Sequence, residues 1–72
     1  MASLLTYKIE MFGEKYVADV ERKNRKYGES VRVILNDEFG NELYRYISFS
    51  SAKDAAIGAI CAYKSGLRGF RF

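Results

Sequence analysis

Apolar and polar residues alternate along the first two-thirds of the chain, which is the spacing expected of β-strands with one buried face. A segment with helical spacing, Ser51 to Ser65, follows the last of these strands. The alternation runs over residues 4–12, 15–22, 30–36 and 42–49. The pattern predicts an α+β fold, in which an antiparallel four-stranded sheet of two hairpins carries one C-terminal helix on one face, in the order β-β-β-β-α.

The first hairpin is predicted to turn at Gly13 and Glu14, since glycine at the first central position is typical of a type II′ turn. With this turn, six apolar residues share the buried face as three cross-strand pairs, Met11 with Tyr16, Ile9 with Ala18 and Tyr7 with Val20. The opposite face then pairs Lys8 with Asp19, as exposure to solvent requires.

The second hairpin is predicted to turn over residues 37–41, where Gly40 can take a positive φ. One register places Arg32 and Arg45 on the open face of the sheet, and a slip by one residue moves Arg45 to the core face. Because burying an unpaired arginine is costly, we expect the first register, which pairs Tyr44 with Leu35 and Tyr46 with Val33. Residues 23–29 between the hairpins are predicted to form a polar, basic loop.

The helix carries signals at both of its ends. Ser51 followed by Asp54 approximates a capping box, and Gly66 is placed to act as the C′ residue. Gly58 is expected on the side away from the sheet, where it weakens the helix by roughly 1 kcal/mol relative to alanine. The predicted buried stripe consists of Ala52, Ala56, Ala59, Ile60 and Tyr63, with Leu67 beyond it.

Length and composition predict one small globular domain over residues 1–72. A single cysteine cannot form an internal disulfide, which favours a reducing, cytoplasmic setting. The apolar run at residues 1–5 is too short for a signal peptide, and no segment reaches the roughly 20 apolar residues of a membrane span. We therefore expect a soluble protein that does not contact a membrane.

The net charge is +3, and the basic residues are clustered. Such a distribution suits nucleic acid or an acidic protein surface, and the simpler alternative is a solvated segment that keeps the protein soluble. An acidic patch is predicted at Asp37, Glu38 and Glu42. The basic residues are Arg22, Lys23, Arg25 and Lys26, next to Tyr27, and then Lys64, Arg68 and Arg71 near the C-terminus.

The open face of the predicted sheet mixes charged and apolar side chains. A contiguous patch of this kind indicates contact with a second copy of the chain, a different protein or nucleic acid. The residues expected there are Lys8, Glu10, Phe12, Val17, Arg32, Ile34, Arg45 and Ile47.

The sequence offers no catalytic or metal-binding constellation. The absence of histidine excludes a cysteine–histidine pair, so Cys61 is expected to be a buried or half-buried structural thiol. Asp37 and Glu38 lie in a predicted turn with no pocket, and there is neither a Cys/His metal spacing nor a glycine-rich phosphate loop. We expect a protein that is not an enzyme and that takes no cofactor, metal or small-molecule substrate.

The C-terminal segment, residues 67–72, combines the arginines Arg68 and Arg71 with the phenylalanines Phe70 and Phe72. Such a tail can bind single-stranded nucleic acid by stacking and phosphate contact, or fold back as a short edge strand with both phenylalanines buried. Because so small a core is short of buried area, we expect the second arrangement.

Two stretches, KYVADVER at residues 15–22 and FSSAKDAA at 49–56, together with Tyr63 and residues 67–69, resemble the plant ethylene-response-type DNA-binding domain. Integrase amino-terminal domains share that architecture. In this family a three-stranded sheet backed by one helix lies in the major groove and reads bases with arginines and tryptophans on its strands. The resemblance implies a helix packed on a sheet, and DNA binding through the sheet.

The chain departs from this family in three ways. It inserts an extra strand between the matching stretches, it has no tryptophan, and the positions that correspond to the groove-reading residues hold Lys8, Glu10 and Phe12. Phosphates repel a carboxylate in such a position. The resemblance therefore favours the fold more than it favours DNA binding.

Two functions of different classes fit these features. The favoured one is a small non-enzymatic protein-interaction module, an inhibitor or adaptor of the sort that small viral genomes encode, which docks through its open sheet face or an edge strand. The alternative is a small nucleic-acid-binding domain that uses residues 22–26 and the sheet arginines, for which a charge of +3 is low. A homodimer is compatible with both. The candidate binding residues are Lys8, Arg22, Lys23, Arg25, Lys26, Tyr27, Arg32, Arg45, Arg68 and Arg71.

Overall fold

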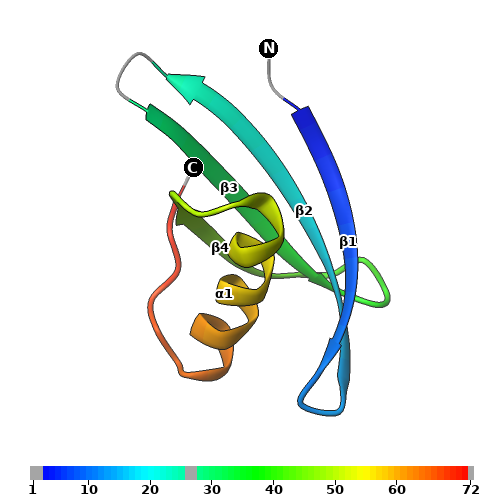
Figure 1. Cartoon of the computed structure of the whole chain (residues 1–72). Coiled ribbons are helices and arrows are strands. Elements are labelled where there is room, and N and C mark those ends of the chain that lie inside the picture. The colour runs from blue at the N-terminus through cyan, green and yellow to red at the C-terminus, as the bar shows by residue number, and fades with distance from the viewer. Residues whose placement is uncertain (1–2, 26–27, 72) are drawn as a thin grey trace.

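The computed structural model describes residues 3–25 and 28–71, and the side chains of residues 4–22 and 30–71. Each strand pairs antiparallel with its neighbour in the sequence, which gives the sheet the order β1-β2-β3-β4 (Figure 1). The predicted α+β fold with the order β-β-β-β-α is confirmed. The elements are β1 (Ser3–Met11), β2 (Glu14–Arg25), β3 (Gly28–Asp37), β4 (Glu42–Ser48) and α1 (Ala52–Lys64).

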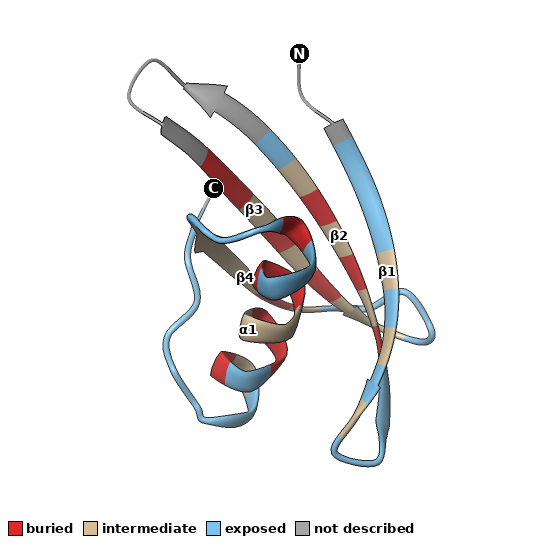
Figure 2. Cartoon of the chain, viewed as in Figure 1, coloured by how far each residue is buried: buried red, intermediate tan, exposed pale blue. Residues whose placement is uncertain are grey.

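The core lies between α1 and one face of the sheet, which we call the helix side (Figure 2). Alternate residues of β2 and β3 are buried there, as the period of two along a strand requires. The helix contributes mostly alanines, whose small side chains let α1 lie close to the strands. The buried apolar residues are Tyr16, Ala18, Val20, Val31, Val33, Leu35, Tyr44, Ala52, Ala55, Ala56, Ala59, Ile60 and Ala62.

Both predicted helix caps are confirmed. The Ser51 hydroxyl accepts a hydrogen bond from the Asp54 N–H, which satisfies one of the amides without a partner in the first turn. At the other end Gly66 has a φ of +75°. The Gly66 N–H donates to Tyr63 C=O and the Leu67 N–H to Ala62 C=O, which is the pair of bonds of a Schellman motif.

Three expectations about the helix region are wrong. Leu67 is exposed, because the left-handed residue Gly66 turns the chain away from the buried stripe. Gly58 faces β4: a Cβ added there would lie 3.5 Å from the Tyr46 ring. Cys61 is exposed, because the buried residues Ala55, Ala59 and Ala62 take the helix face next to it.

The register of the first hairpin differs from the prediction by two residues. Met11 pairs with Glu14, Ile9 with Tyr16 and Tyr7 with Ala18, so the turn is formed by Phe12 and Gly13. The φ angles of these two residues are +55° and +73°, and positive φ at both central positions is what a type I′ turn requires. A shift of two keeps every side chain on its predicted face, although Phe12 now lies in the turn instead of on the open face.

The second hairpin has the predicted register. Tyr44 pairs with Leu35 and Tyr46 with Val33, so Arg32 and Arg45 lie on the face opposite the helix. The register shifts between Leu35 and Asn36, which leaves Leu43 as an extra residue of β4 that packs against the edge of the core.

The predicted loop over residues 23–29 is largely wrong. The pairing of β2 with β3 continues through Lys23↔Ser30 and Asn24↔Glu29 to Arg25↔Gly28. Figure 1 shows that this long hairpin extends beyond the helix at the end of the sheet where β1 begins. Backbone pairing therefore persists past the region where helix packing supports it.

The helix covers the first strand less well than the others. The apolar residues Tyr7, Ile9 and Met11, which were expected beneath the helix, are only half-buried. Leu5 continues this row and is 40% exposed. Figure 2 shows exposed residues along the N-terminal half of β1, which forms one edge of the sheet.

Candidate interaction surface

The face of the sheet opposite α1, which we call the open face, has no helix on it within the part of the chain that the structure describes (Figure 1). Side chains from all four strands project onto it, since residues two apart in a strand share a face. Toward its middle they are half-buried by their own neighbours. The open face consists of Leu4, Thr6, Lys8, Glu10, Lys15, Val17, Asp19, Glu21, Arg32, Ile34, Asn36, Arg45 and Ile47.

Asp19 is the centre of a polar network on the open face. Its Oδ1 accepts a hydrogen bond from the Thr6 hydroxyl at 3.0 Å, and its Oδ2 accepts one from Asn36 Nδ2 at 3.1 Å. These bonds join the side chains of β1, β2 and β3 across the sheet. The network holds the carboxylate in a fixed position.

Three aliphatic side chains, Val17, Ile34 and Ile47, lie among these polar groups. Ile34 is opposite Asp19 on one side and Arg45 on the other, and Ile47 is opposite Arg32. The open face therefore alternates between apolar and charged groups at neighbouring positions.

Cations on this face have carboxylates beside them. Arg45 donates from Nε and Nη2 to Glu42 Oε1, at 3.1 and 2.9 Å. These hydrogen bonds lower the pKa of Glu42 and raise the pKa of Arg45. Two further pairs of opposite charge face one another across strands, Lys15 with Glu10 and Arg32 with Glu21. The charges of the face are thus balanced locally.

The candidate binding residues do not form one surface. Lys8, Arg32 and Arg45 lie on the open face, but Lys8 is on the edge strand farthest from β4. Arg22 lies two residues after the buried Val20 in β2, so it is on the helix side of the sheet, where it is exposed. Lys23 and Arg25 belong to β2, but their side chains are outside the description, and Lys26 and Tyr27 lie outside the described residues.

Arg68 and Arg71 lie in the C-terminal segment, which runs beside the outer edge of β4 (Figure 1). The Phe70 N–H donates to Arg45 C=O at 2.9 Å, and the Tyr44 hydroxyl donates to Arg68 C=O at 3.2 Å. The Phe70 ring meets Tyr46 edge-on, with centroids 6.1 Å apart.

The predicted edge strand with buried phenylalanines is wrong for the described part of this segment. It makes no strand, and Phe70 is 47% exposed; Phe72 lies outside the described residues. Gly69 lies so close to β4 that a Cβ would meet Arg45 O and the Tyr44 ring, each at 3.2 Å. The segment therefore covers β4 by close contact of its backbone, with one backbone hydrogen bond.

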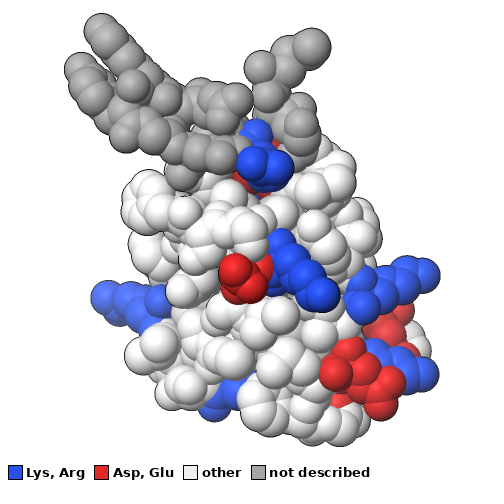
Figure 3. Space-filling model, viewed as in Figure 1, with Lys and Arg blue, Asp and Glu red and all other residues white. Residues whose placement is uncertain are grey.

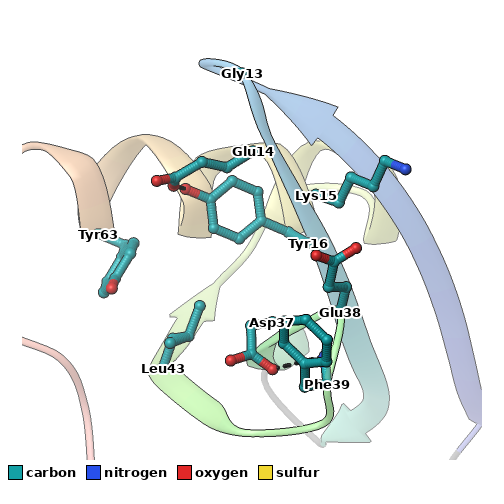
Figure 4. A pocket seen from close by; sticks show the side chains of 9 residues that line it. All are labelled: Gly13, Glu14, Lys15, Tyr16, Asp37, Glu38, Phe39, Leu43 and Tyr63. Carbon is teal, nitrogen blue, oxygen red and sulfur yellow. Dashed lines mark hydrogen bonds between the residues drawn. The ribbon is translucent and has the colours of Figure 1, made fainter.

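A hollow of about 430 Å³ lies where the two hairpin turns meet the C-terminal end of α1 (Figure 4). Tyr63 from the helix and Leu43 from β4 lie on one side of it. Its lining residues are Gly13, Glu14, Lys15, Tyr16, Asp37, Glu38, Phe39, Leu43 and Tyr63.

Two of the carboxylates at this hollow already serve the fold. Glu14 forms an ion pair with Lys64 Nζ at 2.6 Å and accepts a hydrogen bond from the Tyr16 hydroxyl, and these bonds lower the pKa of Glu14. Asp37 accepts hydrogen bonds from the side chain and backbone of Asn41 and from the Phe39 N–H, which lowers the pKa of Asp37. The arrangement stabilises the two turns and does not leave these carboxylates for a ligand.

The helix side carries scattered charges. Figure 3 shows Lys and Arg side chains separated by uncharged surface, some of them beside carboxylates. Among residues 3–25 and 28–71, no three His, Cys, Asp or Glu side chains lie close enough together to hold a metal ion. Within the same residues, no helix has the length and apolar character needed to cross a membrane.

Comparison of the chain with protein-family models, with curated proteins and with solved structures found no match. The resemblance to the plant DNA-binding domain stays a prediction from sequence.

Sequence reasoning missed two features of these surfaces. The Asp19 network was missed because the predicted register placed Lys8, not Thr6, opposite Asp19. The contact of the C-terminal segment with β4 was missed because it consists of a single backbone hydrogen bond and the close approach of one glycine. Neither produces a repeating pattern of apolar and polar residues in the sequence. The glycine between Arg68 and Phe70 was the available signal, since glycine permits a close approach of backbone to a neighbour.

Proposed function

We propose that the protein is a small non-enzymatic interaction module whose open face docks on another protein. The observation that carries this proposal is the local balance of charge around an apolar centre. A partner can bury the aliphatic side chains of Val17, Ile34 and Ile47, while the surrounding side chains supply both hydrogen-bond donors and acceptors. Aliphatic side chains ringed by polar groups are typical of protein-binding patches.

The same balance argues against nucleic acid as the ligand of the open face. Binding to a phosphate backbone depends on cations that replace condensed counterions. On this face Arg45 is held by Glu42, and Arg32 lies opposite Glu21. Asp19 and Glu10 add further negative charge. A protein surface with its own mixture of charges is the better complement.

The test compares two acidic substitutions of exposed apolar residues. Ile47→Glu places a carboxylate on the outer strand β4 of the open face, where Arg32 of β3 lies opposite as a partner of the other sign. Phe49→Glu is the control, because Phe49 is 84% exposed and lies beyond the end of the sheet, in the connection between β4 and α1. Proteins captured by the wild-type chain from its source cells are identified, purified and titrated against each variant.

We expect Ile47→Glu to weaken the binding of a purified partner at least tenfold and Phe49→Glu to change it less than twofold. Equal affinity for both variants would mean that the open face is not the docking surface. If the wild-type chain captures no partner that binds directly after purification, the proposal is wrong.

The alternative, a nucleic-acid-binding domain, is favoured by one observation. Arg68 and Arg71 are exposed beside the half-exposed ring of Phe70, an arrangement that suits phosphate contact with base stacking. Fluorescence anisotropy with mixed-sequence DNA and RNA at two salt concentrations tests this alternative. Binding that weakens with salt and is lost in Arg68→Glu/Arg71→Glu would support it; no salt-sensitive binding at micromolar protein would reject it.

A further inference from the structure

The two edges of the sheet differ in what covers them. The outer edge of β4 lies beside the C-terminal segment, which bonds to it through Phe70 and Arg45. The outer edge of β1 has no strand or segment paired to it within residues 3–25 and 28–71. An edge of this kind presents a row of unpaired amide groups, which is a template for another strand.

Apart from Lys8, β1 lacks the common features that prevent edge pairing. It is nine residues long, its pairing with β2 runs without a shift from Ser3↔Arg22 to Met11↔Glu14, and it contains no proline. Its only charged residues, Lys8 and Glu10, have opposite signs. The helix-side row of β1, in which Leu5 is exposed and Tyr7, Ile9 and Met11 are half-buried, would gain cover from a strand added at this edge.

The geometry points to a second copy of this chain as the added strand, and we propose a homodimer in which β1 pairs antiparallel with β1 of the second copy about a two-fold axis at Tyr7. This inference does not depend on the proposed function. The paired strands would form one continuous eight-stranded sheet. Odd-numbered residues of β1 would lie opposite odd-numbered residues of the second copy, so the helix sides of the two copies, and with them both helices, would be on the same side of this sheet.

The proposed register follows from the direction of the backbone groups. The two-residue turn closes on the hydrogen-bonded pair Met11↔Glu14, so the odd-numbered residues of β1 bond to β2 and the even-numbered ones direct their N–H and C=O outward. A two-fold axis at Tyr7 pairs even residues with even residues over the whole strand. About eight backbone hydrogen bonds result, two for each of the four even-numbered pairs.

Side chains agree with this register. On the helix side, Leu5 meets Ile9 of the second copy, and Tyr7 meets Tyr7 of the second copy. On the open face, Thr6 meets Lys8 of the second copy and Leu4 meets Glu10 of the second copy. No like charges face one another, whereas an axis at Lys8 would place two lysines opposite each other, which is destabilising. On the helix side this register sets apolar residues against apolar residues, Leu5 against Ile9 and Tyr7 against Tyr7, and this match of the strand with itself favours a second copy over an unrelated strand.

The decisive experiment reads the mass of the full chain in solution by light scattering after gel filtration, over a range of concentrations. We expect the wild-type chain to reach twice its own mass as the concentration rises. Thr6→Lys places a lysine opposite Lys8 of the second copy, twice in each dimer, and should raise the dimer dissociation constant at least tenfold. Within the chain the new lysine lies opposite Asp19, so the fold is retained, and a far-UV spectrum together with a melting curve verifies this.

A charge swap tests the register. In Thr6→Lys/Lys8→Glu, the introduced lysine meets the introduced glutamate of the second copy, and the dimer should return to within about threefold of the wild-type dissociation constant. Lys53→Glu on the exposed surface of α1 is the control and should leave dimerisation unchanged.

A wild-type chain that stays monomeric at about 0.5 mM overturns the proposal and leaves the β1 edge to a foreign strand. A dimer that is unaffected by Thr6→Lys also overturns it, since the contact then lies elsewhere. Ile47→Glu, which tests the open face, should not change the dimer, so a failure of the proposed function and a failure of this inference are distinguishable.

Discussion

The two edges of this sheet are held in different ways. At the β4 edge, Tyr44 is buried, with its ring 5.8 Å from Tyr63 of the helix and its hydroxyl bonded to the C-terminal segment. At the β1 edge, the apolar side chains are half-exposed, and an exposed ion pair, Glu14 with Lys64, ties the first turn to the helix. The comparison teaches that one helix can cover two central strands and one edge strand of this sheet, but not all four equally.

The largest expected effect is the loss of an aromatic ring at the β4 edge. Tyr44→Ala should lower the free energy of unfolding by about 3 kcal/mol or more, because it empties a site packed between sheet, helix and tail. Leu5→Ala at the β1 edge should cost less than about 1 kcal/mol, since Leu5 is 40% exposed. Urea denaturation at low micromolar protein measures both, and equal losses would contradict the asymmetry of the edges.

The next effect concerns the segment that covers β4. Gly69→Ala places a Cβ against Arg45 O and the Tyr44 ring, so the segment must move away, at a cost of about 1 kcal/mol for the lost hydrogen bond. The Phe70 amide donates to Arg45 C=O in the wild-type chain, so its hydrogen exchange should be faster in this variant than in the wild type. The amides of Thr6 and Lys8 at the other edge should be unchanged, and a change there would show that the two edges are coupled.

A stabilising substitution sharpens the contact of the helix with β4. Gly58→Ala adds a methyl group in ordinary contact with Tyr46 and removes the backbone freedom of glycine, for a gain of roughly 0.5–1 kcal/mol. Thermal unfolding should shift upward by a few degrees. A lower melting temperature would mean that α1 already lies against β4 without room for a methyl group.

The smallest effect is the pH dependence of the ion pair at the β1 turn. Lys64 holds the pKa of Glu14 below its ordinary value of 4.5. A carboxyl with a lowered pKa stabilises the fold above its ordinary pKa, and this contribution disappears as the pH falls through the lower value. Glu14→Gln should therefore melt slightly below the wild-type chain at pH 7 and together with it in acid. Lys64→Gln should lower the melting temperature at pH 7 in the same way. The double variant should melt no lower than either single variant, and additive decreases in melting temperature would argue against the ion pair.

The sequence predicts the faces of the strands better than their partners. The first hairpin kept Tyr7, Ile9 and Met11 on the predicted face although its register moved by two, because an even shift preserves the alternation. The register itself depended on Phe12, an aromatic residue in a left-handed conformation that residue preferences do not favour. In the second hairpin an arginine on one face decided between the two registers, and that prediction is confirmed.

The candidate site could be predicted only in part. Arg32 and Arg45 were placed on the open face from alternation alone, as the structure has them. The carboxylates beside these arginines were not predicted. Glu42 forms an ion pair with Arg45 within β4, and Glu21 comes to lie opposite Arg32 only when β2 and β3 pair in the folded sheet. Counting charges along the chain cannot reveal this balance, which depends on register.

The strand order also has a consequence for how the chain reaches this structure. Every strand pairs with the one before it in the sequence, so each hairpin can close over a short stretch of chain without waiting for distant segments. Folding rates rise as the contacts of a protein become more local. We expect rapid folding in which β2 and β3 pair early. The helix α1, which follows the four strands in the sequence, would then pack on a sheet that has already formed.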